Sequence, residues 1–363
     1  MTCLEPGERH VYRVLGPAGW SNAMWFNAIP EGSDWSPRVA VFADLGVQDA
    51  TTVPFLTKDV QSGMYDAALH VGDFAYELVR EEGKRGDRFL RQMQPIAAHV
   101  PYMTCAGNAE QYANYTDYKH RFSMPGGTEG MYYSFNMGPV HFVGINTGFY
   151  YFKRYGHDQL VSQYYWLNND LKEASTRSRR EKRPWIVLFG HRPMYCQKDV
   201  ETCQANYVTN PVPGDQKNPS IEYPLNEYGV DLALWAHKHV YHRTWPVAFT
   251  KVKNGTGADP YRNPGAPVHI TVAQAGNKHT RKEHPEPKPW TAFRNTADGY
   301  TRLHFHNHTH MSIEQVAVSE TGTASVIDRA TIVKEAHMPY SFLEPTDRGY
   351  MPVKEKMMGS YAL

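Results

Sequence analysis

The chain has 363 residues, a formal net charge of +1 at pH 7 and 21% charged residues. This length is enough for one large domain or two ordinary domains with a buried core. The near-neutral charge gives no support for binding nucleic acid or an anionic membrane surface, and no run approaches the roughly 20 apolar residues of a membrane helix. We therefore expect a globular protein with no nucleic-acid partner and no membrane span; the oligomeric state is not predicted.

Several features favour an oxidising compartment. Three sequons, at Asn114, Asn254 and Asn307, are candidate N-glycosylation sites. Cys196 and Cys203 are close enough in sequence to close a small disulfide loop. Met1 is not followed by the basic segment and apolar core of a secretory signal. We expect a secreted, lysosomal or otherwise extracellular protein whose true N-terminus is absent from this sequence.

Residues 1–35 have the pattern of a β domain. Residues 10–14 alternate between apolar and polar, a Gly-Pro turn follows at 16–19, and residues 23–28 form a second candidate strand. Two or three strands are too few for independent stability. They either pack on the chain that follows or are the tail of a truncated module.

From residue 38 the pattern changes to strands separated by helices. Near-continuous apolar runs at 38–44, 67–73 and 101–108 are typical of strands that are covered on both faces. Helices are expected at 53–64 and in the segment that reaches Ile96. This βαβαβ order predicts a layered α/β sheet.

The second half mixes helices with antiparallel strands. A hairpin is expected at 132–145, a helix at 158–174 and a solvated basic loop at 177–183. Further strands are expected at the four segments 185–190, 230–235, 267–273 and 300–316, the last being a hairpin. The alternating histidines of that hairpin indicate a wet sheet face rather than a metal site; they are His304, His306, His308 and His310. The tail from Ala336 should wrap the surface.

Five apolar runs end in side chains that can bind a metal. These are Asp44, Asp73, Asn108, His191 and the pair His237 and His239. A lone His-x-His is a weak signal, but the carboxyl ends of strands in α/β sheets meet at one crevice. The mixed oxygen and nitrogen donors exceed what one ion needs. They suit two first-row metals that share a carboxylate and act on a phosphoryl group.

The sequence around these positions resembles the signature blocks of purple acid phosphatases, members of the calcineurin-like metallophosphoesterase superfamily. The blocks are Asp44-x-Gly46, Gly72-Asp73-x-x-Tyr76, Gly107-Asn108-x-Glu110, residues 189–196 and His237-x-His239. The resemblance extends from Trp35 to beyond Thr301 and is strongest to the animal, iron/zinc type. It implies a two-sheet α/β sandwich catalytic domain at 36–363, with a β-rich C-terminal segment and a tail. Residues 1–35 resemble the C-terminal part of a truncated N-terminal β-sandwich (fibronectin III-like) domain.

The resemblance implies two metal sites that share Asp73. Fe(III) would be bound by Asp44, Asp73, Tyr76 and His239, with Tyr76 as a phenolate that replaces the histidine of simpler members at position 46. Zn(II), Fe(II) or Mn(II) would be bound by Asp73, Asn108, His191 and His237. The implied nucleophile is a hydroxide between the metals, with no protein nucleophile. The implied substrate is a phosphate monoester, either a small molecule or a phosphoprotein.

One position departs from the family pattern. The third block normally contains a histidine that faces the substrate and helps to stabilise or protonate the leaving group, and this chain has Ala109 there. A positioned general acid contributes about 100- to 10,000-fold to a rate. We therefore expect an acid phosphatase with reduced activity. The alternatives are a non-catalytic, metal-binding pseudophosphatase of the secretory pathway and a phosphodiesterase of the same superfamily; the physiological substrate is not predicted.

Overall fold

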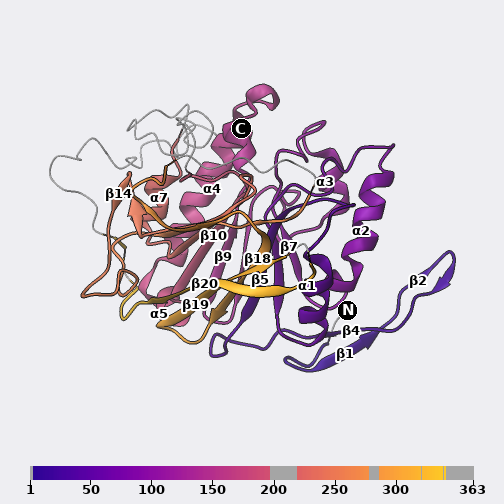
Figure 1. Cartoon of the computed structure of the whole chain (residues 1–363), viewed down its shortest axis with the longest axis horizontal. Helices are drawn as coiled ribbons and strands as arrows, with labels where there is room; N and C mark the ends of the chain where they lie inside the picture. The colour runs from indigo at the N-terminus through magenta and orange to yellow at the C-terminus, as the bar shows by residue number, and fades with distance from the viewer. Residues whose placement is uncertain (1–2, 197–218, 278–285, 320, 338, 341–363) are drawn as a thin grey trace, which may run out of the picture.

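Two mixed β-sheets packed face to face form the centre of the chain (Figure 1). The computed structural model describes residues 3–196, 219–277, 286–319, 321–337 and 339–340. In these residues, the first sheet has the order β20 (Ala324–Val333), β19 (His310–Val318), β18 (Asp298–Phe305), β5 (Arg38–Leu45), β6 (Ala67–His70) and β7 (Tyr102–Thr104), with β16 (Gln274–Gly276) beside β5. The second sheet has the order β17 (Thr291–Asn295), β12 (Tyr241–Thr244), β15 (Val268–Thr271), β11 (Leu232–Trp235), β10 (Trp185–Phe189), β9 (Val140–Gly144) and β8 (Tyr133–Met137).

Alternation along β5 shows why its sequence is apolar throughout. Val39 and Val41 belong to the apolar core that also contains Val187 of the second sheet. Ala40 and Phe42 point the other way, into the core that contains the helices. Because both faces are covered, polar residues have no place on this strand before its end. The predicted layered α/β arrangement is confirmed.

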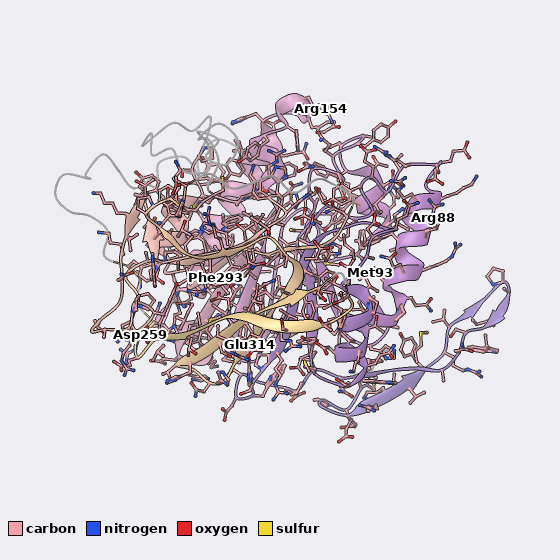
Figure 2. The ribbon with its side chains drawn as sticks, viewed as in Figure 1. Arg88, Met93, Arg154, Asp259, Phe293 and Glu314 are labelled. Atoms are coloured by element: carbon pink, nitrogen blue, oxygen red, sulfur yellow. The ribbon has the colours of Figure 1, made fainter. Side chains whose placement is uncertain are left out.

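Helices cover the outer faces of the sheets. They are α1 (Val53–Gln61), α2 (Lys84–Ala97), α3 (Thr116–Arg121), α4 (Asp158–Ala174), α5 (Arg177–Lys182) and α7 (Glu222–Glu227). On α2, Arg88 points away from the protein, whereas Met93 lies on the inner side and is buried (Figure 2). The next buried position toward the N-terminus of α2, Phe89, contacts the ring of His70 on β6 at a centroid distance of 5.8 Å. No helix in the described part of the chain is long and apolar enough to cross a membrane.

Parallel pairing in both sheets brings several strand ends to one edge. In the first sheet β5, β6 and β7 are parallel, with Phe42 opposite His70 and His70 opposite Thr104. In the second sheet β9, β10, β11 and β15 are parallel, with Leu188 opposite Ala233. The loops that follow β5, β6, β7, β10 and β11 therefore leave the sheets at this edge, where they can contact one another.

The basic stretch 177–183 is not the solvated loop that its sequence predicts. It contains α5, and Arg180 is buried there. The Arg180 guanidinium donates to Oδ2 of buried Asp231 at 3.0 Å, and Lys334 pairs with the other oxygen of the same carboxylate. Asp231 lies 51 residues further along the chain. A local sequence pattern therefore does not show the carboxylate that compensates the buried charge of Arg180.

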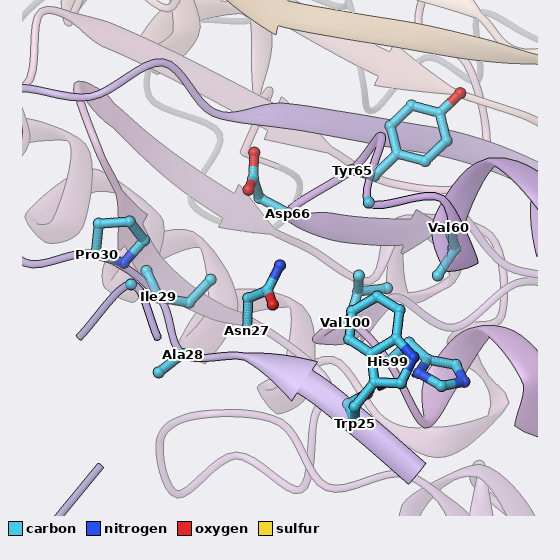
Figure 3. Close-up of a pocket in the computed structure, with 12 residues that line it drawn as sticks. Trp25, Asn27, Ala28, Ile29, Pro30, Val60, Tyr65, Asp66, His99 and Val100 are labelled. Carbon is cyan, nitrogen blue, oxygen red and sulfur yellow. Dashed lines mark hydrogen bonds between the residues drawn. The ribbon is translucent and has the colours of Figure 1, made fainter. Parts of the chain in front are cut away.

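The N-terminal residues form a narrow antiparallel ribbon. Strands β1 (Arg9–Tyr12) and β4 (Met24–Asn27) pair, and β2 (Leu15–Gly16) with β3 (Gly19–Trp20) makes a tip that projects from the molecule (Figure 1). Tyr12 Oη donates to the carbonyl of Ala98 at 2.8 Å, and Trp25 packs on His99. A cavity of about 110 Å³ remains between this ribbon and the α/β layers, lined by Trp25, Asn27, Tyr65 and Asp66 among others (Figure 3).

Candidate metal centre

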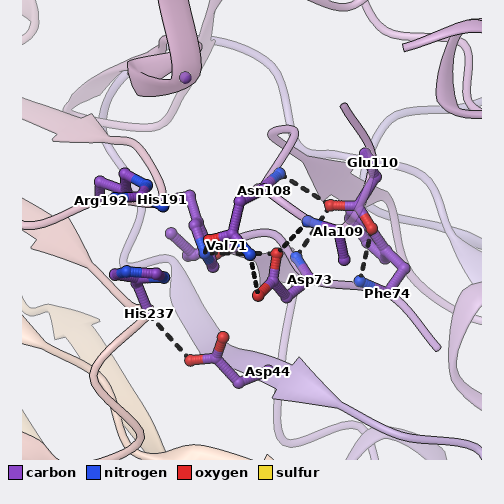
Figure 4. Close-up of polar contacts among 12 residues, drawn as sticks. Asp44, Val71, Asp73, Phe74, Asn108, Ala109, Glu110, His191, Arg192 and His237 are labelled. Atoms are coloured by element: carbon purple, nitrogen blue, oxygen red, sulfur yellow. Dashed lines mark hydrogen bonds and ion pairs between the residues drawn. The ribbon is translucent and has the colours of Figure 1, made fainter. Parts of the chain in front are cut away.

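The predicted ligands lie at the ends of strands from both sheets or on the loops that follow them. Asp44 is the penultimate residue of β5, and Asp73 and Tyr76 follow β6. Asn108 follows β7. From the second sheet, His191 follows β10, and His237 and His239 follow β11. Figure 4 shows most of these side chains turned toward one another.

One group forms around Asp73. The donor atoms of Asp73, His191 and His237 all lie within 4.8 Å of one another. The His191 Nε2 lies 3.4 Å from Asp73 Oδ1 and 3.2 Å from Asn108 Oδ1. These four residues are the ones that the family resemblance assigns to the second metal.

The imidazole of His191 is oriented by the backbone. Its Nδ1 lies 2.9 Å from the carbonyl oxygen of Val71, which can only accept a hydrogen bond, so Nδ1 carries the proton. When Nε2 loses its proton, as metal binding requires, its lone pair faces the space beside Asp73 and Asn108. A backbone carbonyl that fixes the tautomer in this way is typical of a metal-binding histidine.

A second group forms around Tyr76. Its hydroxyl lies 3.0 Å from His239 Nε2, and the same nitrogen lies 3.7 Å from Asp44 Oδ1. Asn277, directly after β16, donates from Nδ2 to the Tyr76 hydroxyl at 2.7 Å. The two histidines of the His-x-His pair thus lie in different groups. His239 is beside Tyr76 and Asp44, and His237 is beside Asp73 and His191.

The backbone joins the two groups. The N–H of His237 donates to Asp44 Oδ2 at 3.0 Å, which ties the loop after β11 to the end of β5. Asp73 receives the N–H of Ala109 on Oδ1 at 2.8 Å. Each carboxylate is therefore oriented by a backbone donor from a different loop.

Five of the seven predicted ligands have positive φ. They are Asp44 (54°), Asp73 (57°), Tyr76 (50°), His237 (71°) and His239 (55°). Left-handed backbone is unfavourable for residues with a Cβ and concentrates at functional sites. Other non-glycine residues of the described chain, such as Glu81 and Asn263, also adopt this region, so the positive φ values support a site together with the clustered side chains.

Two glycines let the first-sheet loops approach each other. A Cβ on Gly107 would lie 2.3 Å from Asp73 Oδ1, and one on Gly72, whose φ is +83°, would lie 2.6 Å from His191 Nδ1. The buried Glu110 carboxylate fastens the same loops, because it accepts N–H bonds from Asp73, Phe74 and Gly107 at 2.8–3.0 Å. These close contacts give the Gly-Asp and Gly-Asn blocks a structural reason.

The electrostatics of the donors favour a cation. Burial raises the pKa of Asp44 to about 8, and its buried Oδ1 has no hydrogen-bond partner among the described residues. Burial also raises the pKa of Asp73, but the charges of His191 and His237 and the hydrogen bonds from His191 and Ala109 together hold the pKa of Asp73 below its usual range. Burial raises the pKa of the Tyr76 hydroxyl well above its ordinary value, so a phenolate there needs a cation at its oxygen. The residues present therefore fit metal ions of the expected kind.

The other predicted sites are less closely defined by the structure. The sequon residues Asn254 and Asn307 are exposed, whereas Asn114 is half-buried and its Oδ1 has no partner among the described side chains. The expected partner of Cys196, Cys203, lies outside the described residues, as does most of the tail after Ala336.

Two residues near the site were not singled out from the sequence. Asn277 follows the short strand β16. It could therefore have been found in the same way as the predicted ligands, as a polar residue at the end of a strand. Arg192 follows His191 directly and lies beside His237 in Figure 4. Nothing in its sequence context distinguishes it from a surface arginine.

Comparisons with known proteins agree with the resemblance. Residues 37–241 match a family model described as calcineurin-like phosphoesterase, and residues 266–329 match one described as iron/zinc purple acid phosphatase-like protein C. The chain is 46% identical to acid phosphatase type 7 of Danio rerio over 348 residues, which cover 93% of this chain and 77% of the relative. Identity to acid phosphatase type 7 of Homo sapiens is 44% over 335 residues, covering 91% and 75%.

A solved structure has the same fold. Purple acid phosphatase PPD1 from yellow lupin (Lupinus luteus) seeds superposes with a TM-score of 0.72 at 23% identity. The match covers 91% of this chain and 60% of the lupin chain. At 23% identity this comparison supports the fold and not the function.

Proposed function

The chain belongs to the purple acid phosphatases of the calcineurin-like metallophosphoesterases, and we propose from this premise that it hydrolyses phosphate monoesters at a two-metal centre. The observation that supports the proposal most is the meeting of side chains from five strand ends of both sheets in one cluster. The names of its acid phosphatase relatives agree with this reaction. Small phosphate esters are the substrates proposed first, and a phosphoprotein side chain second.

We assign the donors to two metals according to their grouping. Asp44, Tyr76 and His239 would hold Fe(III), and Asn108, His191 and His237 would hold Zn(II), Fe(II) or Mn(II). Asp73 would be shared. When bound, the two ions supply an activated water as the nucleophile and withdraw charge from the phosphoryl oxygens.

The side chains and backbone of this chain prepare that centre. The Val71 carbonyl presents the lone pair of His191 to the cluster, and the Ala109 N–H fixes Asp73 Oδ1. Asn277 donates to the oxygen of Tyr76, which lowers the cost of ionising the phenol. Because these orienting groups are already in place, little reorganisation is needed when substrate binds.

The chain lacks the family's leaving-group histidine, and this supports reduced turnover. Ala109 has no proton to give, and its neighbours Asn108 and Glu110 are engaged with Asp73 and the backbone. Slow hydrolysis is the outcome that we propose. A metal-binding protein without catalysis is the second candidate, and the same Ala109 is the observation that favours it.

An assay of the metal-loaded chain with a monoester and a diester at acidic pH tests the proposal. We expect measurable hydrolysis of the monoester, faster than that of the diester, which depends on the metals and disappears in Asp73→Asn. A protein that binds two metals and hydrolyses neither ester would support the non-catalytic candidate. Faster cleavage of the diester would contradict the monoesterase proposal.

We also infer that residues 1–35 form a unit separate from a catalytic domain at 36–363, as the family's β-sandwich domain would. The support is the ribbon, whose tip projects from the molecule and whose base contacts the rest through Tyr12, Met24 and Trp25, while Ile29 and Trp35 pack on the core. Deletion of residues 1–30 should leave metal content and monoester hydrolysis intact. Loss of metal binding would show that the ribbon is part of the catalytic domain.

A secretory-pathway location is proposed on the exposure of two sequon residues, Asn254 and Asn307. Mass spectrometry of the protein purified from its natural source should find glycans at these positions. Unmodified asparagines at both would contradict this location.

A further inference from the structure

Arg192 is held against the candidate metal centre by two kinds of contact. Its backbone N–H donates to Thr147 Oγ1 at 2.8 Å, which fixes the start of the side chain. Its guanidinium carbon lies 4.4 Å from the ring centroid of Tyr151 and 5.4 Å from that of Phe152. Both rings follow the short helix η1 (Thr147–Tyr150). The side chain is thus held in a defined position by aromatic rings.

The guanidinium of Arg192 makes no ion pair in the described part of the chain, although the charge of Asp73 acts on it from a greater distance. No carboxylate there lies within ion-pair distance of its guanidinium, and its buried Nε has no hydrogen-bond partner. Aromatic faces attract a cation but accept none of its directional N–H bonds. A partly buried guanidinium without an acceptor costs stability.

The site supplies a reason for this arrangement. Arg192 is next to His191 in sequence, and Figure 4 draws it beside His237, on the opposite side of Asn108 from Ala109. Its charge is close enough to lower the pKa of His237, after the larger effects of burial and of His191. A cation is therefore present beside the donor cluster, on the side away from the position where the family histidine is missing.

We propose that Arg192 binds the phosphoryl group of the substrate and carries part of the charge stabilisation that Ala109 cannot provide. This inference rests on the proposed phosphatase function. The planar guanidinium fork matches two oxygens of a phosphate, and such charge-assisted pairs are among the stronger hydrogen bonds in proteins. Because a guanidinium does not release its proton at physiological pH, Arg192 stabilises negative charge but does not protonate a leaving group.

Inorganic phosphate is the probe that tests this role. Its dissociation constant would be measured by calorimetry on the metal-loaded wild type, Arg192→Gln and Arg192→Lys, with metal content and thermal stability recorded for each. The control is Arg154→Gln, because Arg154 also lies over an aromatic ring, that of Tyr155 at 4.8 Å, but is exposed.

We expect Arg192→Gln to weaken phosphate binding by about 10- to 100-fold, the range of one to two charged hydrogen bonds. The lysine variant should fall between it and the wild type, and Arg154→Gln should bind phosphate as the wild type does. The KM for a monoester should rise in Arg192→Gln. Its metal content should be unchanged and its thermal stability equal to or above that of the wild type, because an uncompensated charge is removed. If Arg192 had a purely structural role, Arg192→Gln would instead have a lower thermal stability than the wild type.

Two results would overturn the inference, and only the second would also overturn the proposed function. If Arg192→Gln binds phosphate as tightly as a wild type that hydrolyses monoesters, the role of Arg192 is wrong and the proposed function stands. If the metal-loaded wild type neither binds phosphate nor hydrolyses a monoester, the proposed function fails together with the inference.

Discussion

The backbone N–H of Ala109 donates to Oδ1 of Asp73 at 2.8 Å. The main chain of residue 109 therefore supports the Asp73 carboxylate, which the two metals are proposed to share. This support does not depend on the side chain at position 109. Ala109 is only partly buried, so its Cβ is not enclosed by neighbours. An alanine at position 109 is thus compatible with an intact ligand cluster. It removes the family's leaving-group histidine without removing a candidate metal ligand.

Ala109→His should raise the rate of monoester hydrolysis by about 100- to 10,000-fold, the typical contribution of a positioned general acid. The gain should be largest for alkyl esters, whose leaving groups need a proton most. Steady-state kinetics with aryl and alkyl phosphates provides the measurement. Ala109→Asn is the control, because it adds a polar side chain that does not transfer a proton. Equal rates for the alanine and histidine proteins would show that the missing histidine does not limit turnover.

Glu110→Gln should loosen the metal centre without removing a ligand. The carboxylate accepts three backbone N–H bonds from the loops that carry Asp73 and Asn108. A glutamine has one acceptor oxygen, and its NH2 would face a backbone donor. We expect metal affinity to fall by about 10- to 100-fold, as for other residues that support ligands. Competition with a chelator measures this change.

The control for Glu110 is Glu129→Gln, whose carboxylate is exposed and pairs with Lys119. It should retain metal as the wild type does. A Glu110→Gln protein that resists the chelator equally well would indicate that the loops are held without this carboxylate.

Asn277→Ala should change the colour of the iron-loaded protein without abolishing it. The amide of Asn277 donates to the Tyr76 oxygen, and such a bond stabilises a phenolate. Its loss raises the energy of the phenolate electrons, so the phenolate-to-iron absorption band should move to longer wavelength. An absorption spectrum at equal iron content tests this. An unmoved band would mean that Asn277 does not act on the iron-bound oxygen.

The sequence predicted the parts of the fold that local patterns determine. Helix α4 has the predicted bounds of residues 158–174 because its apolar residues recur along one face. The strand ends were located because buried strands leave no other place for polar side chains. The long edge strand β20 and the burial of Arg180 were missed. Strand β20 pairs with β19, the strand directly before it, with a register shift in the pairing. The burial of Arg180 depends on Asp231, 51 residues further along the chain, which no local pattern reveals.

The candidate site shows the same division. The candidate ligands could be located because each stands at the end of a strand or on the loop after it. The division of His237 and His239 between Asp73 and Tyr76 was implied by the family resemblance and not by a local pattern, because it depends on the positive φ of the two histidines. Arg192 was missed because its significance lies in the absence of an acceptor in the described residues around it, a property of packing alone.

Acid should destabilise the fold partly through His269. Burial lowers the pKa of His269 to about 3, and Trp235 Nε1 donates to its Nδ1 at 3.1 Å, so the folded ring stays neutral. The unfolded chain binds this proton below about pH 6.5, so each pH unit between there and pH 3 costs up to about 1.4 kcal/mol of stability. His269→Gln should lose about 2.7 kcal/mol less than the wild type between pH 7.5 and 4.5.

Urea unfolding at the two pH values measures this difference. The exposed His120→Gln is the control and should keep the pH dependence of the wild type. If His269→Gln loses as much stability on acidification as the wild type, the proton is not excluded at this position.

The central claim is that Tyr76 and its neighbours hold iron beside a second metal. Metal analysis of the natural protein together with its visible absorption spectrum, with Tyr76→Phe measured in parallel, tests it most directly. We predict two metals per chain, one of them iron, and a visible band that Tyr76→Phe loses while metal is retained. A colourless wild type that contains only zinc would contradict the account.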